Sequence, residues 1–271
     1  MPTNIEIGRL QLAVLAILLL VAKAATAMQQ QPAGFEGMWS DPPHSAVGEF
    51  CFAWCTDAGI DYLNKLLDDP ANDARPFGEL LAQATKYQAD AYIKPLLTAD
   101  ALKAYPLDPA DDPAFLRCQP IGGARQIFVR HQLDIRRRGK DRLEFHYGEW
   151  DATRTIYVDG RKRPPKEPPS RMGYSLGHWE GDALVIETSG FTPDRLESNI
   201  AVHSDQLRIV ERYTRAPDGK TLMLTVTIED PTILRAPLVF KKIWGWSPAS
   251  HIDPYRDCQI PTEILKGTNR K

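Results

Sequence analysis

The sequence lacks most of the short motifs that mark catalytic and nucleotide-binding sites. It has no Gly-x-Ser-x-Gly elbow, no His-Glu-x-x-His zinc motif and no glycine-rich phosphate loop. It also lacks Cys-x-x-Cys pairs and EF-hand loops, and its six histidines are scattered. We therefore expect no metal and no organic cofactor, and the missing elbow disfavours serine hydrolysis.

An excess of positive charge is also missing. Lysine and arginine number 33 against 35 aspartates and glutamates, which gives a formal net charge of -2. Nucleic-acid binding needs a concentrated basic surface, so we expect no nucleic-acid partner. The one basic cluster, Arg136-Arg137-Arg138, runs into Gly139 and is typical of a solvated turn.

Long hydrophobic runs are limited to the beginning of the chain. Arg9 precedes an apolar run from Leu10 to Ala22, and Ala25-Thr26-Ala27 follows it. This order predicts a signal peptide over 1–27, and the run is short for a membrane span. We expect a periplasmic or secreted protein with no stable membrane span after signal cleavage.

Cysteine is scarce as well, with four residues in the whole chain. In an exported protein an even number of cysteines favours disulfides over metal binding or nucleophilic catalysis. We predict that Cys118 pairs with Cys258 and that Cys51 pairs with Cys55, which is one of three connectivities.

Alternating apolar and polar residues dominate the second half of the chain. They predict a mainly β fold, an antiparallel meander that closes into a lipocalin-like barrel or half-barrel around a small-molecule site. The expected strands are Gln126 to His131, Leu133 to Arg137, Arg142 to Tyr147, Thr153 to Val158, two in Tyr174 to Phe191, Leu207 to Tyr213, Thr221 to Ile228 and Pro237 to Trp246.

The first half of the chain predicts a different organisation. We expect a linker and first strand over 28–56, a helical cap over 57–105, and a barrel domain with a C-terminal arm over 106–271. Gly37-Met38-Trp39 resembles the Gly-x-Trp motif of lipocalins. The helical insertion separates this motif from the other strands, so we do not assign the chain to the lipocalin family.

Several blocks together resemble a large, mostly uncharacterised family of exported bacterial proteins. They span roughly the C-terminal two-thirds of the chain, and the resemblance implies no catalytic assignment. The blocks are Asp111-Asp112-Pro113 through Cys118, Arg154 through Arg161, Gly177-His178-Trp179-Glu180-Gly181-Asp182-Ala183-Leu184-Val185, His203-Ser204, Glu211-Arg212-Tyr213 and Asp230-Pro231.

Two histidines have carboxylates within reach in the predicted sheet. Glu144 and His146 share one face of a strand, about 7 Å apart, and form either an acid–base pair or a solvated outer surface. His178 is expected near Glu187 or Asp182, where it could transfer protons near neutral pH or serve a structural role.

Two further candidates lie on the following strands. His203 begins one strand beside Ser204, and Glu211 shares a face with Leu207 and Ile209. Glu211 is therefore expected either in the barrel interior or paired with an arginine such as Arg154.

Aromatic and basic residues near these candidates are expected to bind a ligand. The proline-rich segment 161–170 predicts an irregular loop that lies over the barrel mouth and closes a cavity around His178, Tyr174 and Arg161. The ligand-binding candidates are Tyr157, Arg161, Tyr174, Trp179, Arg212 and Tyr213.

These residues favour an exported, cofactor-free enzyme. It would act as a lyase or isomerase, by aldol-type cleavage or dehydration of a small, partly aromatic substrate. The alternatives are a barrel that binds a small apolar ligand without catalysis, and a structural envelope protein. The sequence leaves the oligomeric state open.

Overall fold

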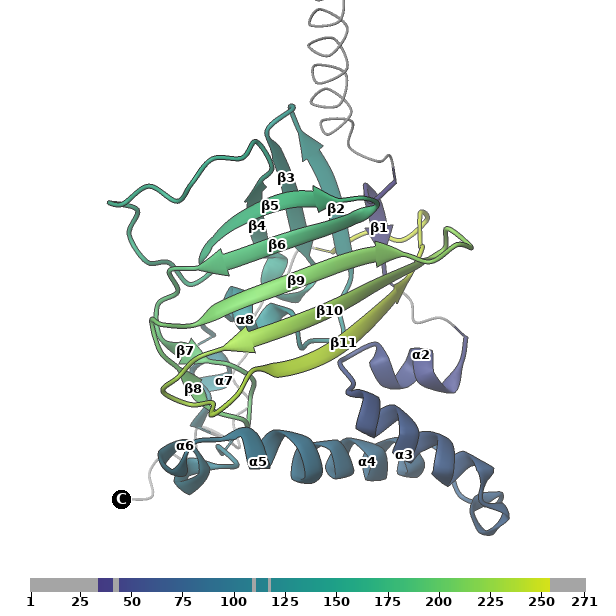
Figure 1. Ribbon diagram of the computed structural model, residues 1–271. Coiled ribbons are helices and arrows are strands. Elements are labelled where there is room, and N and C mark those ends of the chain that lie inside the picture. Colours follow the sequence, from purple (N-terminus) through teal and green to yellow (C-terminus); the bar gives the residue numbers. More distant parts are fainter. Residues whose placement is uncertain (1–33, 41–43, 109–110, 117, 254–271) are drawn as a thin grey trace, which may run out of the picture. The chain divides into compact units, whose positions relative to one another are not determined.

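Nine strands form one sheet that curls into a nearly closed, lipocalin-like barrel (Figure 1). This count applies to the computed structural model, which describes residues 34–40, 44–108, 111–116 and 118–253. The strands are β1 (Gly37–Trp39), β2 (Leu133–Arg138), β3 (Arg142–Tyr147), β4 (Thr153–Tyr157), β5 (Tyr174–Glu180), β6 (Ala183–Ser189), β9 (Arg208–Arg215), β10 (Thr221–Glu229) and β11 (Leu238–Gly245). The short strands β7 (Asp194–Arg195) and β8 (Val202–His203) form a separate ribbon.

The sheet follows chain order, as the meander predicts, and its neighbouring strands are antiparallel with one exception. β4 and β5 run parallel, with Ile156 opposite Ser175. The connection between them carries the proline-rich segment 161–170 back along the barrel, because parallel neighbours need a long crossover. That segment is largely exposed.

The two edges of the sheet meet at one end of the barrel. Trp39 at the end of β1 bridges Trp246 just after β11, and Ser247 N donates to Met38 O over 3.0 Å. The indoles of Trp39 and Trp246 pack edge to face with centroids 4.9 Å apart. Gly37 has φ +121°, and an added Cβ there would lie 2.2 Å from the ring of Trp246. The Gly-x-Trp motif therefore lies where the barrel closes.

Side chains alternate between the interior and the outer surface. On β10 the interior face holds Leu222, Leu224, Val226 and Ile228, all buried, as the alternation predicts. The turn before this strand is confirmed by Gly219, which has φ +67° and donates its N–H to Ala216 O. These faces decide which candidate residues point inward.

Helices occupy the segment between β1 and β2. They are α2 (Ala46–Cys51), α3 (Asp57–Asp68), a 3-10 turn (Pro70–Asn72), α4 (Phe77–Gln88), a π-helical turn (Ala89–Ile93), α5 (Lys94–Leu96), α6 (Ala99–Ala104), α7 (Pro113–Leu116) and α8 (Gly123–Gln126). Ser45, Thr56 and Thr98 cap α2, α3 and α6 with their side-chain oxygens. The helical region therefore begins at Ala46, inside the segment predicted to be a linker.

Backbone hydrogen bonds join this helical region to the barrel. Cys55 and Lys241 exchange two bonds of 2.9 and 2.7 Å, so the residue that precedes the N-cap of α3 pairs with β11. Thr98 N donates to Ile233 O over 2.9 Å at the other end. Figure 1 shows α3 to α6 running beneath β11.

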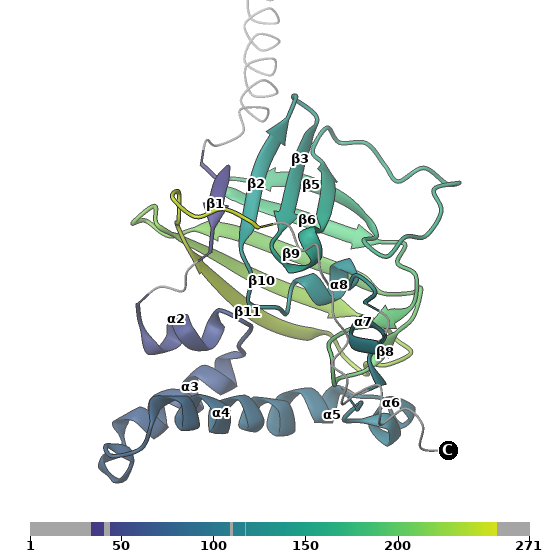
Figure 2. The same ribbon diagram turned by 180° about the vertical axis from the view of Figure 1, so that it is seen from behind.

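The strand predicted over Gln126 to His131 is wrong. Residues 121–128 are all buried, and they contain α8 and the turn after it. Figures 1 and 2 show α8 across β9 and β10, on the concave side of the sheet. The alternation in this segment reflects burial inside the barrel rather than strand pairing.

The predicted Cys51–Cys55 disulfide is confirmed, and both cysteines are fully buried. Cys118 is also disulfide-bonded, whereas its predicted partner Cys258 lies outside the described residues. The predicted signal peptide over 1–27 and most of the C-terminal arm lie outside them too. Among the helices that the structure describes, none has the length and apolar character to cross a membrane.

Candidate functional site

An ion pair lies inside the barrel. Arg154 on β4 places Nη2 2.8 Å from Oε2 of Glu211 on β9, and both side chains are almost completely excluded from solvent. Tyr213 donates its hydroxyl to Glu211 Oε1 over 2.8 Å. Glu211 is thus both interior and paired with Arg154, which are the two environments that its strand position predicts.

Tyr147 on β3 completes this interior cluster. Its hydroxyl is buried and has no hydrogen-bond partner among the described residues, and the same holds for Nε of Arg154. The guanidinium carbon of Arg154 lies 5.9 Å from the centroid of the Tyr147 ring and 5.5 Å from that of Phe145. Two polar hydrogens in an apolar interior are therefore left without acceptors.

Burial sets the protonation states in this cluster. Burial raises the pKa of Tyr147 and of Tyr213, and the negative charge of Glu211 adds to both shifts. Burial alone would lower the pKa of Arg154, but Glu211, with smaller effects from Tyr147 and Tyr213, offsets burial and raises it. At neutral pH both phenols are therefore uncharged beside the Arg154–Glu211 ion pair.

Lys242 on β11 is a second buried cation of the interior. It is 1% exposed, and its Nζ donates to Ile127 O over 3.2 Å and to Val129 O. Nζ also lies 4.6 Å from the ring centroid of Trp244. Burial, with a smaller effect from the charge of Arg130, lowers the pKa of Lys242 to about 7.

Stacked aromatic rings lie between the Arg154–Glu211 pair and Lys242. Tyr213 and Trp244 are stacked with centroids 6.4 Å apart, and Phe145 packs edge-on against Tyr213 at 5.4 Å. Polar groups thus lie on both sides of an aromatic wall. Such a surface suits a flat ring that carries a polar substituent.

His178 does not belong to this interior site. It lies opposite Val185, not beside Glu187 or Asp182, and its Nε2 is 3.1 Å from Glu180 Oε1. Its side chain is 51% exposed, because Gly177 and Trp179 occupy the inner face of β5. The predicted pairing of His178 with Glu187 or Asp182 is therefore wrong.

Arg212 and Glu187, two further candidates, form surface ion pairs on this outer face. Arg212 contacts Glu180 at 2.5 Å, and Arg208 contacts both Glu187 and Glu229. These side chains are roughly half exposed. Exposed pairs of this kind contribute little to stability, so they define a solvated face.

Glu144 and His146 lie on the outer face of the sheet, where each pairs with another residue. Glu144 accepts a bond from Arg138 over 2.6 Å, and His146 Nε2 lies 2.5 Å from Asp151. Both lie on the outer face of β3, while Leu143 and Phe145 between them are buried. They do not form an acid–base pair with each other.

Tyr157, Tyr174 and Arg161 meet on the outer surface. The two tyrosine rings stack with centroids 5.1 Å apart, and the Arg161 guanidinium lies 4.1 Å from the Tyr157 ring. Arg161 also binds Asp159. Tyr174 and Arg161 are thus brought together as expected, with Tyr157 in contact with both, whereas His178 is not part of this group.

Trp179 is the one ligand-binding candidate of β5 that faces inward. Its ring packs against Phe35 with centroids 5.2 Å apart, and its Nε1 is buried without a hydrogen-bond partner among the described residues. It belongs to the interior wall, like Tyr213.

His203 is the one candidate histidine that is buried, with 2% exposure. Its Nδ1 lies 3.0 Å from Ser204 O, which fixes the tautomer with a proton on Nδ1 and leaves Nε2 as an acceptor. Asp194 lies opposite it in the β7–β8 ribbon. Burial lowers the pKa of His203, so the ring is neutral at pH 7.

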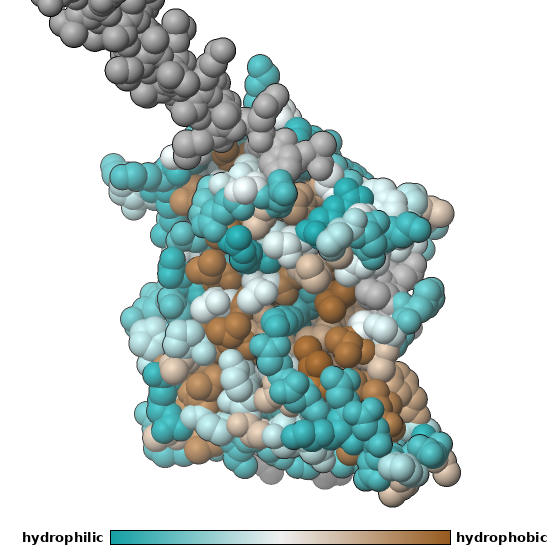
Figure 3. Space-filling view, turned by 45° about the vertical axis from the view of Figure 1, so that its right-hand side comes forward, coloured by the Kyte–Doolittle hydropathy of each residue, from teal (hydrophilic) through white to brown (hydrophobic). Residues whose placement is uncertain are grey.

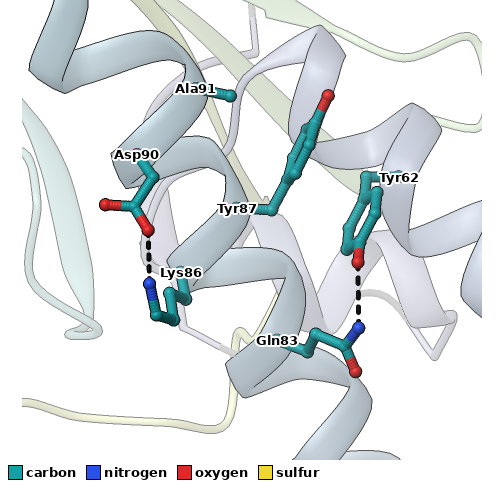
Figure 4. Close-up of a pocket in the computed structure, with 6 residues that line it drawn as sticks. All are labelled: Tyr62, Gln83, Lys86, Tyr87, Asp90 and Ala91. Atoms are coloured by element: carbon teal, nitrogen blue, oxygen red, sulfur yellow. Dashed lines mark hydrogen bonds and ion pairs between the residues drawn. The ribbon is translucent and has the colours of Figure 1, made fainter.

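A shallow groove lies on the helices, where the sequence indicates only packing elements (Figure 4). Tyr62 of α3 and Tyr87 of α4 stack with centroids 4.0 Å apart, and Gln83 donates to the Tyr62 hydroxyl over 2.9 Å. The groove has a volume of about 340 Å³. Figure 3 shows hydrophobic residues on one face of the molecule in patches interrupted by hydrophilic ones.

Three interior residues were not identified as site residues from the sequence, namely Arg154 as a ligand contact, Tyr147 and Lys242. The sequence nevertheless indicates an interior position for each of them, because apolar residues stand two positions away on the same face of the strand. Lys242 stands between Phe240 and Trp244, and Tyr147 follows Leu143 and Phe145 on the buried face.

The fold and this interior define the class: a lipocalin-like barrel with a charged and aromatic interior. Comparison of the chain with protein-family models, with curated proteins and with solved structures finds no match.

Proposed function

We propose that the barrel binds a small aromatic molecule in its interior, with the polar end of the ligand at Tyr147 and Arg154. One observation carries this proposal: the buried Tyr147 hydroxyl has no hydrogen-bond partner among the described residues. A buried polar group left unpaired costs about 1–3 kcal/mol, which a ligand acceptor would recover. Binding is thus the event that satisfies this group.

The surroundings define the ligand further. Phe145, Tyr213 and Trp244 offer ring faces and edges, which favours a planar aromatic body. The free donors, Tyr147 Oη–H and Arg154 Nε–H, call for an acceptor such as a carbonyl, carboxylate or phenolate oxygen. This matches the small, partly aromatic ligand expected from the sequence.

The test is a titration of the purified protein with 4-hydroxybenzoate, 4-hydroxycinnamate and 6-hydroxy-2-naphthoate, followed by tryptophan fluorescence. Tyr147→Phe removes the hydroxyl and keeps the ring, so the affinity should fall about tenfold, as one lost hydrogen bond implies. Tyr157→Phe on the outer face is the matched control and should bind like the unmodified protein. Equal affinities for Tyr147→Phe and the unmodified protein would refute the site.

A second function, proton-transfer catalysis, rests on His203. Its neutral ring, its fixed tautomer and its Nε2 acceptor are the properties of a general base. In this proposal the protein is the cofactor-free lyase or isomerase suggested by the sequence, with His203 in place of the exposed His178 and His146.

Mass spectrometry separates the two functions. The protein is incubated with phenolic and other aromatic metabolites, and new products are sought. Catalysis predicts products that disappear in His203→Gln and persist in His178→Gln, the matched surface control. Saturable binding with every compound recovered unchanged leaves the carrier function and removes the enzyme.

We also propose export to the periplasm or the medium, and membership in the exported bacterial family that the chain resembles. The Cys51–Cys55 disulfide is compatible with an oxidising compartment. Cell fractionation together with the intact mass of the mature protein tests this. A mature chain that retains residues 1–27 in the cytoplasm would contradict it.

A further inference from the structure

We infer that the ligand of the barrel is a monoanion, an aromatic carboxylate or an equivalent acid, whose negative charge is balanced by Lys242. This inference rests on the proposed binding function and specifies its ligand class. It follows from the position of Lys242, from the partners of its Nζ and from the charge balance of the interior.

Lys242 is buried as deeply as the apolar core, and no carboxylate contacts it in the part of the chain that the structure describes. An ammonium group has three donors. Two reach the carbonyl oxygens of Ile127 and Val129 in the segment after α8. The third side of Nζ faces the Trp244 ring, a weaker partner than an anionic oxygen.

The interior charges do not cancel. Arg154 and Glu211 neutralise each other, as do Arg125 and Asp112, so protonated Lys242 leaves one uncompensated positive charge. Buried charges are normally paired, and a single negative charge would complete the set. A neutral ligand would leave the interior with one net positive charge, and a dianion would leave it with one net negative charge.

One aromatic ring can reach both polar groups. Leu224 of β10 lies between Tyr213 of β9 and Lys242 of β11 in register, so these two residues are two strands apart, about 10 Å, on the same face. Trp244 stacks with Tyr213 and contacts Nζ of Lys242. A flat ligand along this stack would place its carboxylate near Lys242 and a second polar substituent, such as a hydroxyl or carbonyl oxygen, toward the Tyr147 cluster.

Binding is then linked to a proton. The charged group within electrostatic reach of Lys242 among the described residues is Arg130, and it disfavours the ammonium. Because burial lowers the pKa of Lys242 to about 7, the free amine predominates at pH 8.5. An anion beside Nζ favours the ammonium, so binding takes up as much as one proton, and affinity falls by up to about tenfold per pH unit above this pKa.

The experiment is isothermal titration calorimetry with 6-hydroxy-2-naphthoate and with its neutral amide, at about pH 8.5 and in two buffers of different ionisation enthalpy. The acid should bind at least about tenfold more tightly than the amide, as one compensated charge implies. The measured enthalpy of binding of the acid should differ between the two buffers by nearly the full difference in their ionisation enthalpies, because binding takes up nearly one proton.

Two variants assign the effect to Lys242. Lys242→Arg keeps a positive charge that does not titrate near pH 8.5. Binding to this variant should therefore take up no proton, while the preference for the acid over the amide remains. Lys242→Met should lose both, and circular dichroism checks that each variant is folded. The measurement on the unmodified protein stands even if a variant fails to fold.

The outcomes are distinguishable. Equal affinity for acid and amide without proton uptake overturns the monoanion and leaves the binding function in place. If neither compound binds, the proposed function fails and this inference fails with it.

Discussion

Arg154 on β4 and Glu211 on β9 meet inside the barrel at 2.8 Å, although 57 residues separate them in the sequence and neither is exposed. The pair connects strands on opposite parts of the sheet. It also holds the polar end of the proposed binding site, because Tyr213 donates to Glu211 and Tyr147 lies beside Arg154.

The first prediction concerns this pair. Arg154→Met leaves the Glu211 carboxylate buried without its cation, so the free energy of unfolding should fall by about 3–5 kcal/mol. Urea unfolding measures it. Arg208→Met removes an exposed arginine that also has carboxylate partners, and it should cost less than about 1 kcal/mol.

The double variant Arg154→Met with Glu211→Leu serves as the second control. It removes both charges and should recover most of the lost stability, because no unpaired charge remains buried. A double variant as unstable as the single one would show that the pair itself stabilises the fold.

The second prediction is a stability that rises with pH. The pKa of Lys242 is about 7 in the folded protein against 10.5 for an ordinary lysine. The unfolded chain therefore binds more protons between these values, and the free energy of unfolding should increase by about 1.4 kcal/mol per pH unit in this window. Below the folded pKa the dependence due to Lys242 disappears.

Urea unfolding at several values between about pH 7.5 and 9.5 measures this slope before ordinary tyrosines ionise. Lys242→Met removes the titrating group, so its slope should be smaller than that of the unmodified protein by nearly the full amount. Identical slopes for the two proteins would mean that Lys242 keeps an ordinary pKa.

The third prediction concerns closure of the barrel. Gly37→Ala places a Cβ 2.2 Å from the Trp246 ring and imposes φ +121° on an alanine, so we expect a loss of about 3 kcal/mol or more. Gly181 also has a positive φ, but an added Cβ there meets nothing within 4 Å. Gly181→Ala should therefore cost only about 1 kcal/mol. Similar losses in both variants would contradict the role of Gly37 in closure.

The fourth prediction concerns the disulfide between Cys51 and Cys55. It closes a loop of sequence separation 4, so its entropic contribution is small, about 2 kcal/mol. The double variant Cys51→Ala with Cys55→Ala should lose that much in a thermal or urea melt. A chelator should leave the melting temperature of the unmodified protein unchanged, and a large drop would reveal a structural metal.

Much of the sheet could be predicted because its signals are local. The apolar residues of β10 alternate with polar ones, and the turn before it carries Gly219 at a positive φ. Glu211 shares that alternation, which is why an interior position or a pairing with an arginine such as Arg154 was expected, and the structure combines the two. A pattern of period two determines which residues share a face.

The same pattern does not decide which face points inward when both faces carry apolar residues. In β6, Leu184 faces inward and Val185 outward, yet both are buried. His178 lies opposite Val185, so its predicted place beside a cavity depended on a choice that this pattern does not make. Lys242 was missed for a different reason: a lysine next to another lysine is typical of a solvated strand.

The most direct test of interior binding is anomalous X-ray diffraction from crystals of the protein with 4-bromobenzoate, whose bromine locates the ring independently. We predict a bromine signal inside the barrel beside Trp244 or Phe145, with the polar and aromatic side chains of the interior around the ligand. A bromine signal found only on the outer surface, for example in the groove at Tyr62 and Tyr87, would contradict the proposed function.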